Sequence, residues 1–133
     1  MKYNIGDKTV EYVSFAYEDV LKYAALSGDT NPLHVDKEYA QKNRFGEIIV
    51  HGMLASSVFS KILGTKMPGN GCIYLEQMLI FKKPVYIDTP LSARVEIVDI
   101  TEKGKKKIID LKTDLLDDTG QYLICGTAKV LVE

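Results

Sequence analysis

The pattern of hydrophobic and polar residues divides the chain into a helical part and a strand part. In the N-terminal half, apolar residues at helical spacing predict a helix over residues 18–26, which ends at Gly28. A second, short helix is expected over residues 36–43, with Asp36 as its cap. Residues 28–34, which lie between them, are rich in Gly, Asp, Asn and Pro, so we expect a loop there.

The most hydrophobic helix is expected from Gly52 to Leu63, and Gly64 follows as a stop. Apart from three serines and Lys61, its residues are apolar or glycine. A helix that is apolar nearly all round is enclosed by other elements instead of lying on a surface. This segment is therefore predicted to be the central helix of the fold.

Other segments read as strands: residues 8–15 are rich in β-branched and aromatic residues, and a period of two residues shows within 91–101 and 107–116. Strands are expected over residues 8–15, 73–81, 91–101, 107–116 and 122–132. Consecutive strands favour antiparallel pairing, and the enclosed helix must then lie against the concave face of the curled sheet. We predict one α+β domain over residues 1–133: a hot-dog fold, with about five antiparallel strands wrapped around a long central helix.

Composition and charge narrow the classes of function. The 133 residues fit one core, and 46% hydrophobic and 26% charged residues are ordinary for a soluble globular protein. A net charge of −1 argues against a nucleic-acid partner. With neither a signal-peptide pattern nor an apolar run that could span a membrane, we expect a cytoplasmic protein without a membrane partner. Cys72 and Cys125 are expected to be free thiols rather than a disulfide.

Asp29 and His34 are the first candidates for chemistry. They lie five positions apart across the Asn31–Pro32 break, where a folded loop could bring both onto one target. An unperturbed histidine titrates near pH ~6.5 and exchanges protons at neutral pH, and a carboxylate can accept one. Together they could position one water molecule. The alternative is that both side chains only brace the loop.

His51 and Gly52 lie at the start of the predicted central helix. We favour a structural role for His51, such as a cap of this helix. The first N–H groups of a helix have no internal partner, so Gly52 could offer a donor to an oxygen that gains negative charge. Alternatively, Gly52 is needed only for a tight entry into the helix.

The residues around these candidates resemble the MaoC-like dehydratase family, the (R)-specific enoyl-CoA hydratases. The resemblance is carried by Tyr23 to Asp36 (YAALSGDTNPLHVD) and by residues 49–53 (IVHGM). It continues through residues 56–63, 67–71, 73–75 and 81–85, and so covers most of the chain.

The resemblance implies a function and roles for particular residues. Asp29 and His34 would be the catalytic pair, the Gly52 N–H would bind the thioester carbonyl, and Ser60 would line the site. The activity would be that of a hydro-lyase, the reversible addition of water to trans-2-enoyl-CoA giving (R)-3-hydroxyacyl-CoA. No organic cofactor or metal would be needed, because coenzyme A is part of the substrate.

The resemblance also implies a homodimer with the acyl site near its interface, since the edges of a five-stranded sheet must be paired or covered. We expect Ser60, Leu63 and Val130 to contact the acyl chain. The bulk of Leu63 favours short chains.

Particular residues argue against several other functions. A hot-dog thioesterase generally needs an acidic residue on the central helix, and residues 52–63 contain none. A non-catalytic acyl-CoA binding module would need neither Asp29 nor His34. A metal site made of Asp29, His34, Asp36 and His51 is chemically acceptable, but their spacing matches no ligand motif. Lysines 103 and 105–107 flank a predicted hairpin turn, where solvated surface is favoured over contacts with CoA phosphates.

Overall fold

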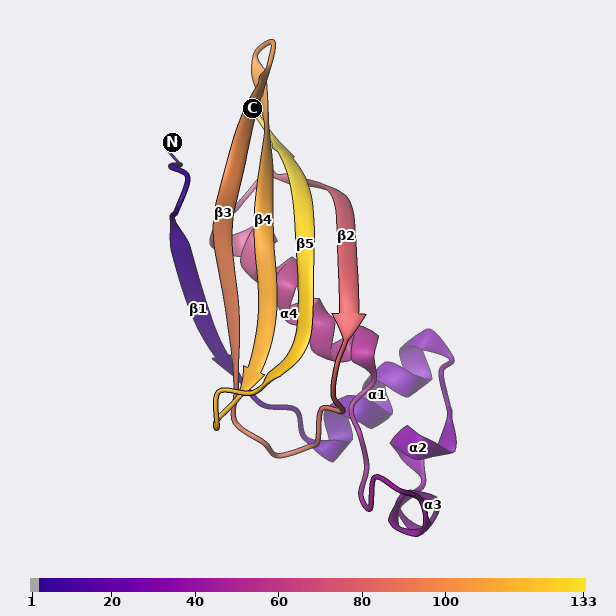
Figure 1. Cartoon of the computed structure of the whole chain (residues 1–133). Helices are drawn as coiled ribbons and strands as arrows, with labels where there is room; N and C mark the ends of the chain where they lie inside the picture. Colours follow the sequence, from indigo (N-terminus) through magenta and orange to yellow (C-terminus); the bar gives the residue numbers. More distant parts are fainter. Residues whose placement is uncertain (1–2) are drawn as a thin grey trace.

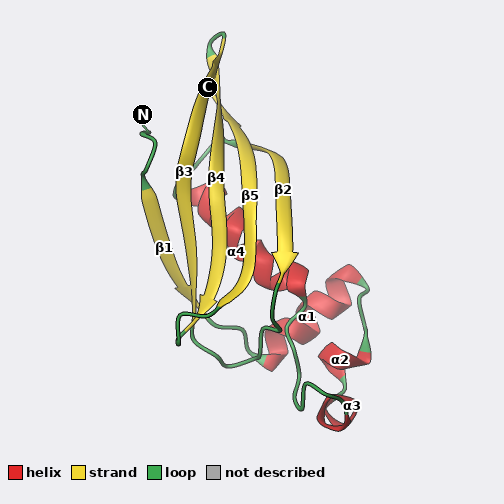
Figure 2. Cartoon of the chain, viewed as in Figure 1, coloured by secondary structure: helices red, strands yellow, loops and turns green. Residues whose placement is uncertain are grey.

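Five antiparallel strands form a single curled sheet in the computed structural model, which describes residues 3–133 (Figures 1 and 2). The strands follow one another across the sheet in the order β1-β3-β4-β5-β2. Their bounds are Lys8–Val13 (β1), Ile73–Phe81 (β2), Leu91–Lys103 (β3), Lys106–Asp117 (β4) and Tyr122–Val132 (β5). The predicted hot-dog fold is confirmed, with β1 and β2 at the two edges of a sheet that does not close into a barrel.

One long helix lies across a face of this sheet, and three shorter helices gather at one end of it (Figure 1). The helices are Tyr17–Ser27 (α1), Pro32–Val35 (α2), Lys37–Lys42 (α3) and Gly52–Thr65 (α4). The long helix is α4, the predicted central helix. No helix in the described part of the chain is long and apolar enough to cross a membrane.

The core lies between α4 and the sheet. Phe59, Ile62 and Leu63 of α4 are completely buried and belong to one hydrophobic cluster with residues of β3, β4 and β5, among them Ile97 and Leu111. Each large side chain buried in this way stabilises the fold by about 1.5–3 kcal/mol. The core therefore holds α4 firmly, and the position of its N-terminus is fixed with it.

The predicted end of α4 at Gly64 is wrong. The helix continues to Thr65, and the N–H of Lys66 donates to the carbonyl of Ile62 at 2.8 Å. Gly64 does not adopt the left-handed conformation that ends a helix. By contrast, Gly28 ends α1 as predicted, with φ of 82° and its N–H bonded to the carbonyl of Ala24.

The predicted loop over residues 28–34 is only partly correct, because its last residues form the single turn α2. Asn31 precedes this turn with a non-helical backbone (φ −51°, ψ 126°), and its side chain accepts the N–H of Leu33 at 3.1 Å. Pro32 stands in the first turn, where its missing N–H costs nothing. The Asn-Pro pair therefore starts a helix here, and that helix carries His34.

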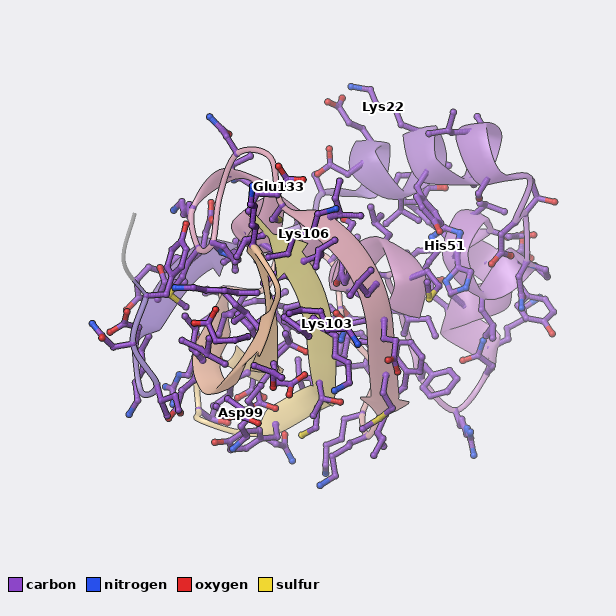
Figure 3. All side chains as sticks on the ribbon, turned by 90° about the horizontal axis from the view of Figure 1, so that it is seen from above. Lys22, His51, Asp99, Lys103, Lys106 and Glu133 are labelled. Atoms are coloured by element: carbon purple, nitrogen blue, oxygen red, sulfur yellow. The ribbon has the colours of Figure 1, made fainter. Side chains whose placement is uncertain are left out.

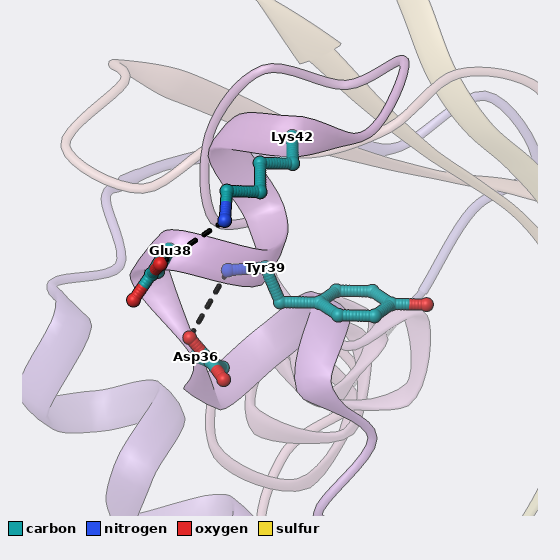
Figure 4. A network of polar contacts seen from close by, with 4 residues as sticks. All are labelled: Asp36, Glu38, Tyr39 and Lys42. Atoms are coloured by element: carbon teal, nitrogen blue, oxygen red, sulfur yellow. Dashed lines mark hydrogen bonds and ion pairs between the residues drawn. The ribbon is translucent and has the colours of Figure 1, made fainter.

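Helix α3 confirms the predicted cap. The carboxylate of Asp36 accepts the N–H of Tyr39 at 3.0 Å, and Glu38 pairs with Lys42 one turn further on (Figure 4).

In the strands, β1 ends at Val13, two residues earlier than expected. Cys72 and Cys125 are free thiols, also as expected.

Candidate active site

Three polar side chains meet where α1, α2 and α4 come together. Asp29 follows the end of α1, His34 lies on α2, and His51 immediately precedes α4. One carboxylate oxygen or ring nitrogen of each lies within 4.8 Å of those of the other two. The structure thus brings Asp29 and His34 together, as predicted from the sequence, and adds His51 to them.

The ring of His34 is held by one hydrogen bond. Its Nδ1 lies 2.7 Å from the carbonyl oxygen of Ile49. Because a carbonyl can only accept, Nδ1 carries the proton, and in the neutral ring Nε2 is free to accept one. The half-buried His34 is thereby set up for proton exchange at Nε2.

The carboxylate of Asp29 is exposed and only lightly held. Its Oδ1 accepts the N–H of Asn31 at 3.3 Å, and the side chain makes no other hydrogen bond or ion pair within residues 3–133. No cation neutralises this carboxylate within the described chain. It therefore keeps free lone pairs for a water molecule or a substrate.

His51 does not cap α4 with its side chain, so the predicted capping role is wrong. Its Nε2 instead lies 2.9 Å from the carbonyl oxygen of Asp29. The rings of His34 and His51 are stacked, with centroids 3.9 Å apart and planes at 27°. The ring of Tyr23 meets His51 edge-on, with centroids 4.7 Å apart. His51 is 2% exposed and lies beneath the pair.

Gly52 is the first residue of α4, and both roles considered for it fit its surroundings. The first helical bond runs from the N–H of Ala55 to the carbonyl of His51, so the N–H of Gly52 has no partner within the helix. A Cβ added at Gly52 would lie 2.6 Å from a ring carbon of Phe81. Glycine thus permits close packing and also leaves an N–H donor at the cavity.

These groups open into a cavity of about 450 Å³, a size typical of small-molecule sites. Its remaining wall comes from residues 44–45, 49–50, 53 and 81–85 and from Tyr23. Three exposed cationic residues, Arg44, Lys82 and Lys83, stand in this wall. Sequence reasoning missed them as site residues because they belong to separate segments.

A second cavity of about 440 Å³ lies between α4 and the edge strand β2. Tyr23 and Met53 line both cavities, which are therefore neighbours. The wall of the second cavity is mostly apolar and includes Leu75 and Leu79. Burial raises the pKa of Tyr74, also in this wall, to about 12, so its phenol stays neutral at physiological pH.

The structure separates the three residues predicted to contact an acyl chain. Ser60 is exposed and lines the second cavity. Leu63 and Val130 are completely buried in the core and line neither cavity. An acyl chain would have to displace core contacts to reach them, so their role stays a prediction.

The geometry of the two histidines does not suit a shared metal ion. A bound ion lies about 2.0–2.1 Å from a ring nitrogen and in the plane of that ring. Rings stacked at 3.9 Å with nearly parallel planes cannot both point a lone pair at one such position. Asp36, the fourth ligand considered, is not in the cluster and caps α3 instead.

The lysines considered for CoA phosphates are distant from these cavities. Lys103 and Lys106 end β3 and begin β4, so they lie on the hairpin at the tip of the sheet (Figure 1). His51 lies among the helices, away from both of them (Figure 3). Solvated surface is thus the better interpretation of the hairpin lysines.

Comparison with known proteins identifies relatives that match most of the chain. The model of the MaoC like domain matches residues 5–119. The (R)-specific enoyl-CoA hydratase of Aeromonas caviae is 40% identical over 126 residues, which cover 95% of this chain and 92% of the relative. A mitochondrial 3-hydroxyacyl-(acyl-carrier-protein) dehydratase of Solanum lycopersicum, FERN, is 38% identical over 96% of this chain and 76% of its own.

Solved structures show the same similarity. An (R)-hydratase from A. caviae involved in PHA biosynthesis superimposes with a TM-score of 0.91 at 39% identity, over 96% of each chain. The sequence resemblance and the fold therefore point to the same group of proteins.

Proposed function

Because the chain belongs to the MaoC-like domain family, we propose that it is an (R)-specific enoyl-CoA hydratase. It adds water reversibly to a trans-2-enoyl thioester to give the (R)-3-hydroxyacyl thioester. One observation carries the proposal: Asp29 and His34 lie together in one cavity with the N–H end of α4.

The N–H of Gly52 binds the thioester carbonyl oxygen. Polarisation of that carbonyl makes C3 electrophilic and stabilises the negative charge that reaches the oxygen when C3 is attacked. The dipole of α4 adds to this effect, because its positive end faces the same point. Losing one such donor typically costs ~100- to 1,000-fold in kcat.

Asp29 and His34 hold the attacking water between them. The pair takes a proton from the water as its oxygen bonds to C3, and a proton then passes from the pair to C2. The electron pair of the C2–C3 double bond, held as an enolate on the thioester, forms the new C2–H bond. His34 takes part through Nε2, because its Nδ1–H is bonded to Ile49. Acid–base chemistry alone balances the reaction, so no organic cofactor or metal takes part.

The acyl chain extends from the first cavity into the second, over Ser60, Leu75 and Leu79. The apolar wall of this cavity suits a hydrocarbon. A thioesterase on the same fold is the weaker alternative, because α4 carries no acidic residue to activate water. We expect the protein to act in the cytoplasm.

The phosphates of the carrier arm bind at Arg44, Lys82 and Lys83. Changing Lys82 and Lys83 together to Glu is expected to raise KM for crotonyl-CoA about tenfold with little change in kcat, since each exposed charge contact contributes ~0.2–1 kcal/mol. Steady-state kinetics at low and moderate salt would measure this effect.

The matched control replaces Lys103 and Lys106, on the distant hairpin, by Glu. It carries the same change of charge and should leave KM unaltered. For crotonyl-pantetheine, which lacks phosphates, the Lys82/Lys83 variant and the wild type should have the same KM. A larger rise in KM for the hairpin variant would contradict this assignment.

We expect a homodimer formed through β2. This edge strand pairs only with β5 in the described chain, and five of its large apolar side chains are about half exposed. They are Ile73, Leu75, Met78, Ile80 and Phe81. Pairing two β2 strands would join the sheets of two copies and bury these side chains.

Sedimentation equilibrium at micromolar concentration should therefore give twice the chain mass of 14.9 kDa. Replacing Met78 and Ile80 together by Lys should give a monomer. The control Tyr12→Lys changes an exposed aromatic on the other edge strand, β1, and should stay dimeric. A monomeric wild type would refute the expectation.

A further inference from the structure

We propose that His51 is the positioning residue of this site: it holds the main chain of Asp29 and supports the ring of His34. The inference rests on the proposed function, in which Asp29 and His34 perform the chemistry. It assigns His51 a task beyond capping or filling the core.

The first contact ties the α1–α2 turn to the start of α4. The Nε2–H of His51 donates to the carbonyl of Asp29 at 2.9 Å, across 22 positions of the sequence. The side chain of Asp29 is exposed and accepts only the N–H of its neighbour Asn31 within the described chain. The bond from the buried His51 therefore connects the main chain of Asp29 to the start of the central helix.

The second contact limits the rotation of His34. Its ring lies on that of His51 at 3.9 Å, while its Nδ1–H donates to Ile49. A stacked neighbour and one in-plane hydrogen bond together leave the ring a single orientation. Proton transfer needs such a fixed orientation, because a small displacement of a reacting group lowers the rate strongly.

The arrangement is poor for stability, which argues that it serves something else. The Nδ1 of His51 is buried and has no hydrogen-bond partner among residues 3–133. A buried polar atom without a partner lowers stability, and an apolar ring of similar shape would avoid that cost. Ser, Thr, Asp or Asn at this position would also cap α4 better than His51 does.

The missing cap has a consequence for the cavity. A capping side chain would accept one of the first N–H groups of α4 and lie across its end. His51 turns toward Asp29 instead and leaves the helix end with its donors, including that of Gly52, uncovered. The same side chain thus positions the acid–base pair and keeps the carbonyl-binding end of α4 open.

Three substitutions separate these contacts. His51→Gln places an amide N–H near the Nε2 position and keeps the bond to Asp29. His51→Asn reaches only the Nδ1 position and loses that bond. His51→Phe keeps a ring beneath His34 but offers no donor.

For crotonyl-CoA hydration, the Asn and Phe variants are expected to lose ~10- to 100-fold in kcat, with KM within about twofold of the wild type. The Gln variant should keep most of the wild-type kcat, because its amide N–H still donates to the carbonyl of Asp29. Thermal unfolding of the Phe variant should occur close to the wild-type temperature, because the lost bond to Asp29 is offset by removal of the unpaired nitrogen. Equal losses in all three variants together with lower melting temperatures would show a merely structural role and overturn the proposal, as would three variants with wild-type kcat.

The tautomers give a test that does not depend on activity. The chain has two histidines, so long-range ¹H–¹⁵N spectra of the wild type and of His51→Gln assign both. We expect the proton on Nε2 in His51 and on Nδ1 in His34. The opposite tautomer of His51 would overturn the positioning role even in an active enzyme, whereas a wild type with these tautomers but no hydration would refute the proposed function alone.

Discussion

Asp29→Asn is expected to lower kcat for crotonyl-CoA hydration by ~100- to 10,000-fold, or about 3 to 5 kcal/mol of barrier, with little change in KM. Asparagine keeps the shape of the side chain and the bond to Asn31 but cannot take a proton. Substrate binding should survive, because the carrier and acyl chain contact other parts of the two cavities. Steady-state kinetics on the purified variant measures both constants.

The double variant Asp29→Asn/His34→Ala should lose far less than the product of the two single losses. Both side chains handle one water and its protons, so removing the second adds little once the first is gone. Independent losses that multiply would indicate that the two groups do not act on a common step.

The alternative that Asp29 and His34 only brace the α1–α2 turn predicts a different result. The variants would then unfold at lower temperature and keep much of their turnover per folded molecule. A folded Asp29→Asn protein with more than about a tenth of the wild-type kcat would rule out the catalytic role.

Gly52→Pro is expected to lower kcat by ~100- to 1,000-fold, because proline removes the N–H that binds the thioester carbonyl. The first position of a helix tolerates proline, whose missing N–H is not used there. His51 already has φ of −53° and ψ of 133°, a conformation compatible with a following proline. Circular dichroism should therefore show an intact helix content.

The matched control is Gly52→Ala, which adds the same Cβ but keeps the N–H. Both variants must move the ring of Phe81, which would lie 2.6 Å from the new carbon. Only the proline variant also loses the N–H, so the alanine variant should keep more activity than the proline variant. Equal losses in the two variants would show that Gly52 is needed only for close packing.

The sequence alone predicted the architecture well, because the signals for it are local. Alternating residues in β3 and β4 and the nearly continuous apolar run of α4 each specify which faces are buried, and little more is needed to place a helix against a sheet. The acid–base candidates Asp29 and His34 were also found from the sequence, because they belong to one short motif. Even there, propensity did not show that Asn31 and Pro32 start a helical turn.

Only the tertiary structure decided how distant segments share the site. The carbonyl of Asp29 lies beside His51 because α1 and α4 meet, and no sequence pattern relates two residues 22 positions apart. Arg44 and Lys83 also lie in one cavity wall although they belong to distant segments of the sequence. Burial of Leu63 within the core likewise depends on the packing of α4 against the sheet. Periodicity indicates which side of an element is apolar, but the partner on that side is set by the packing of the whole chain.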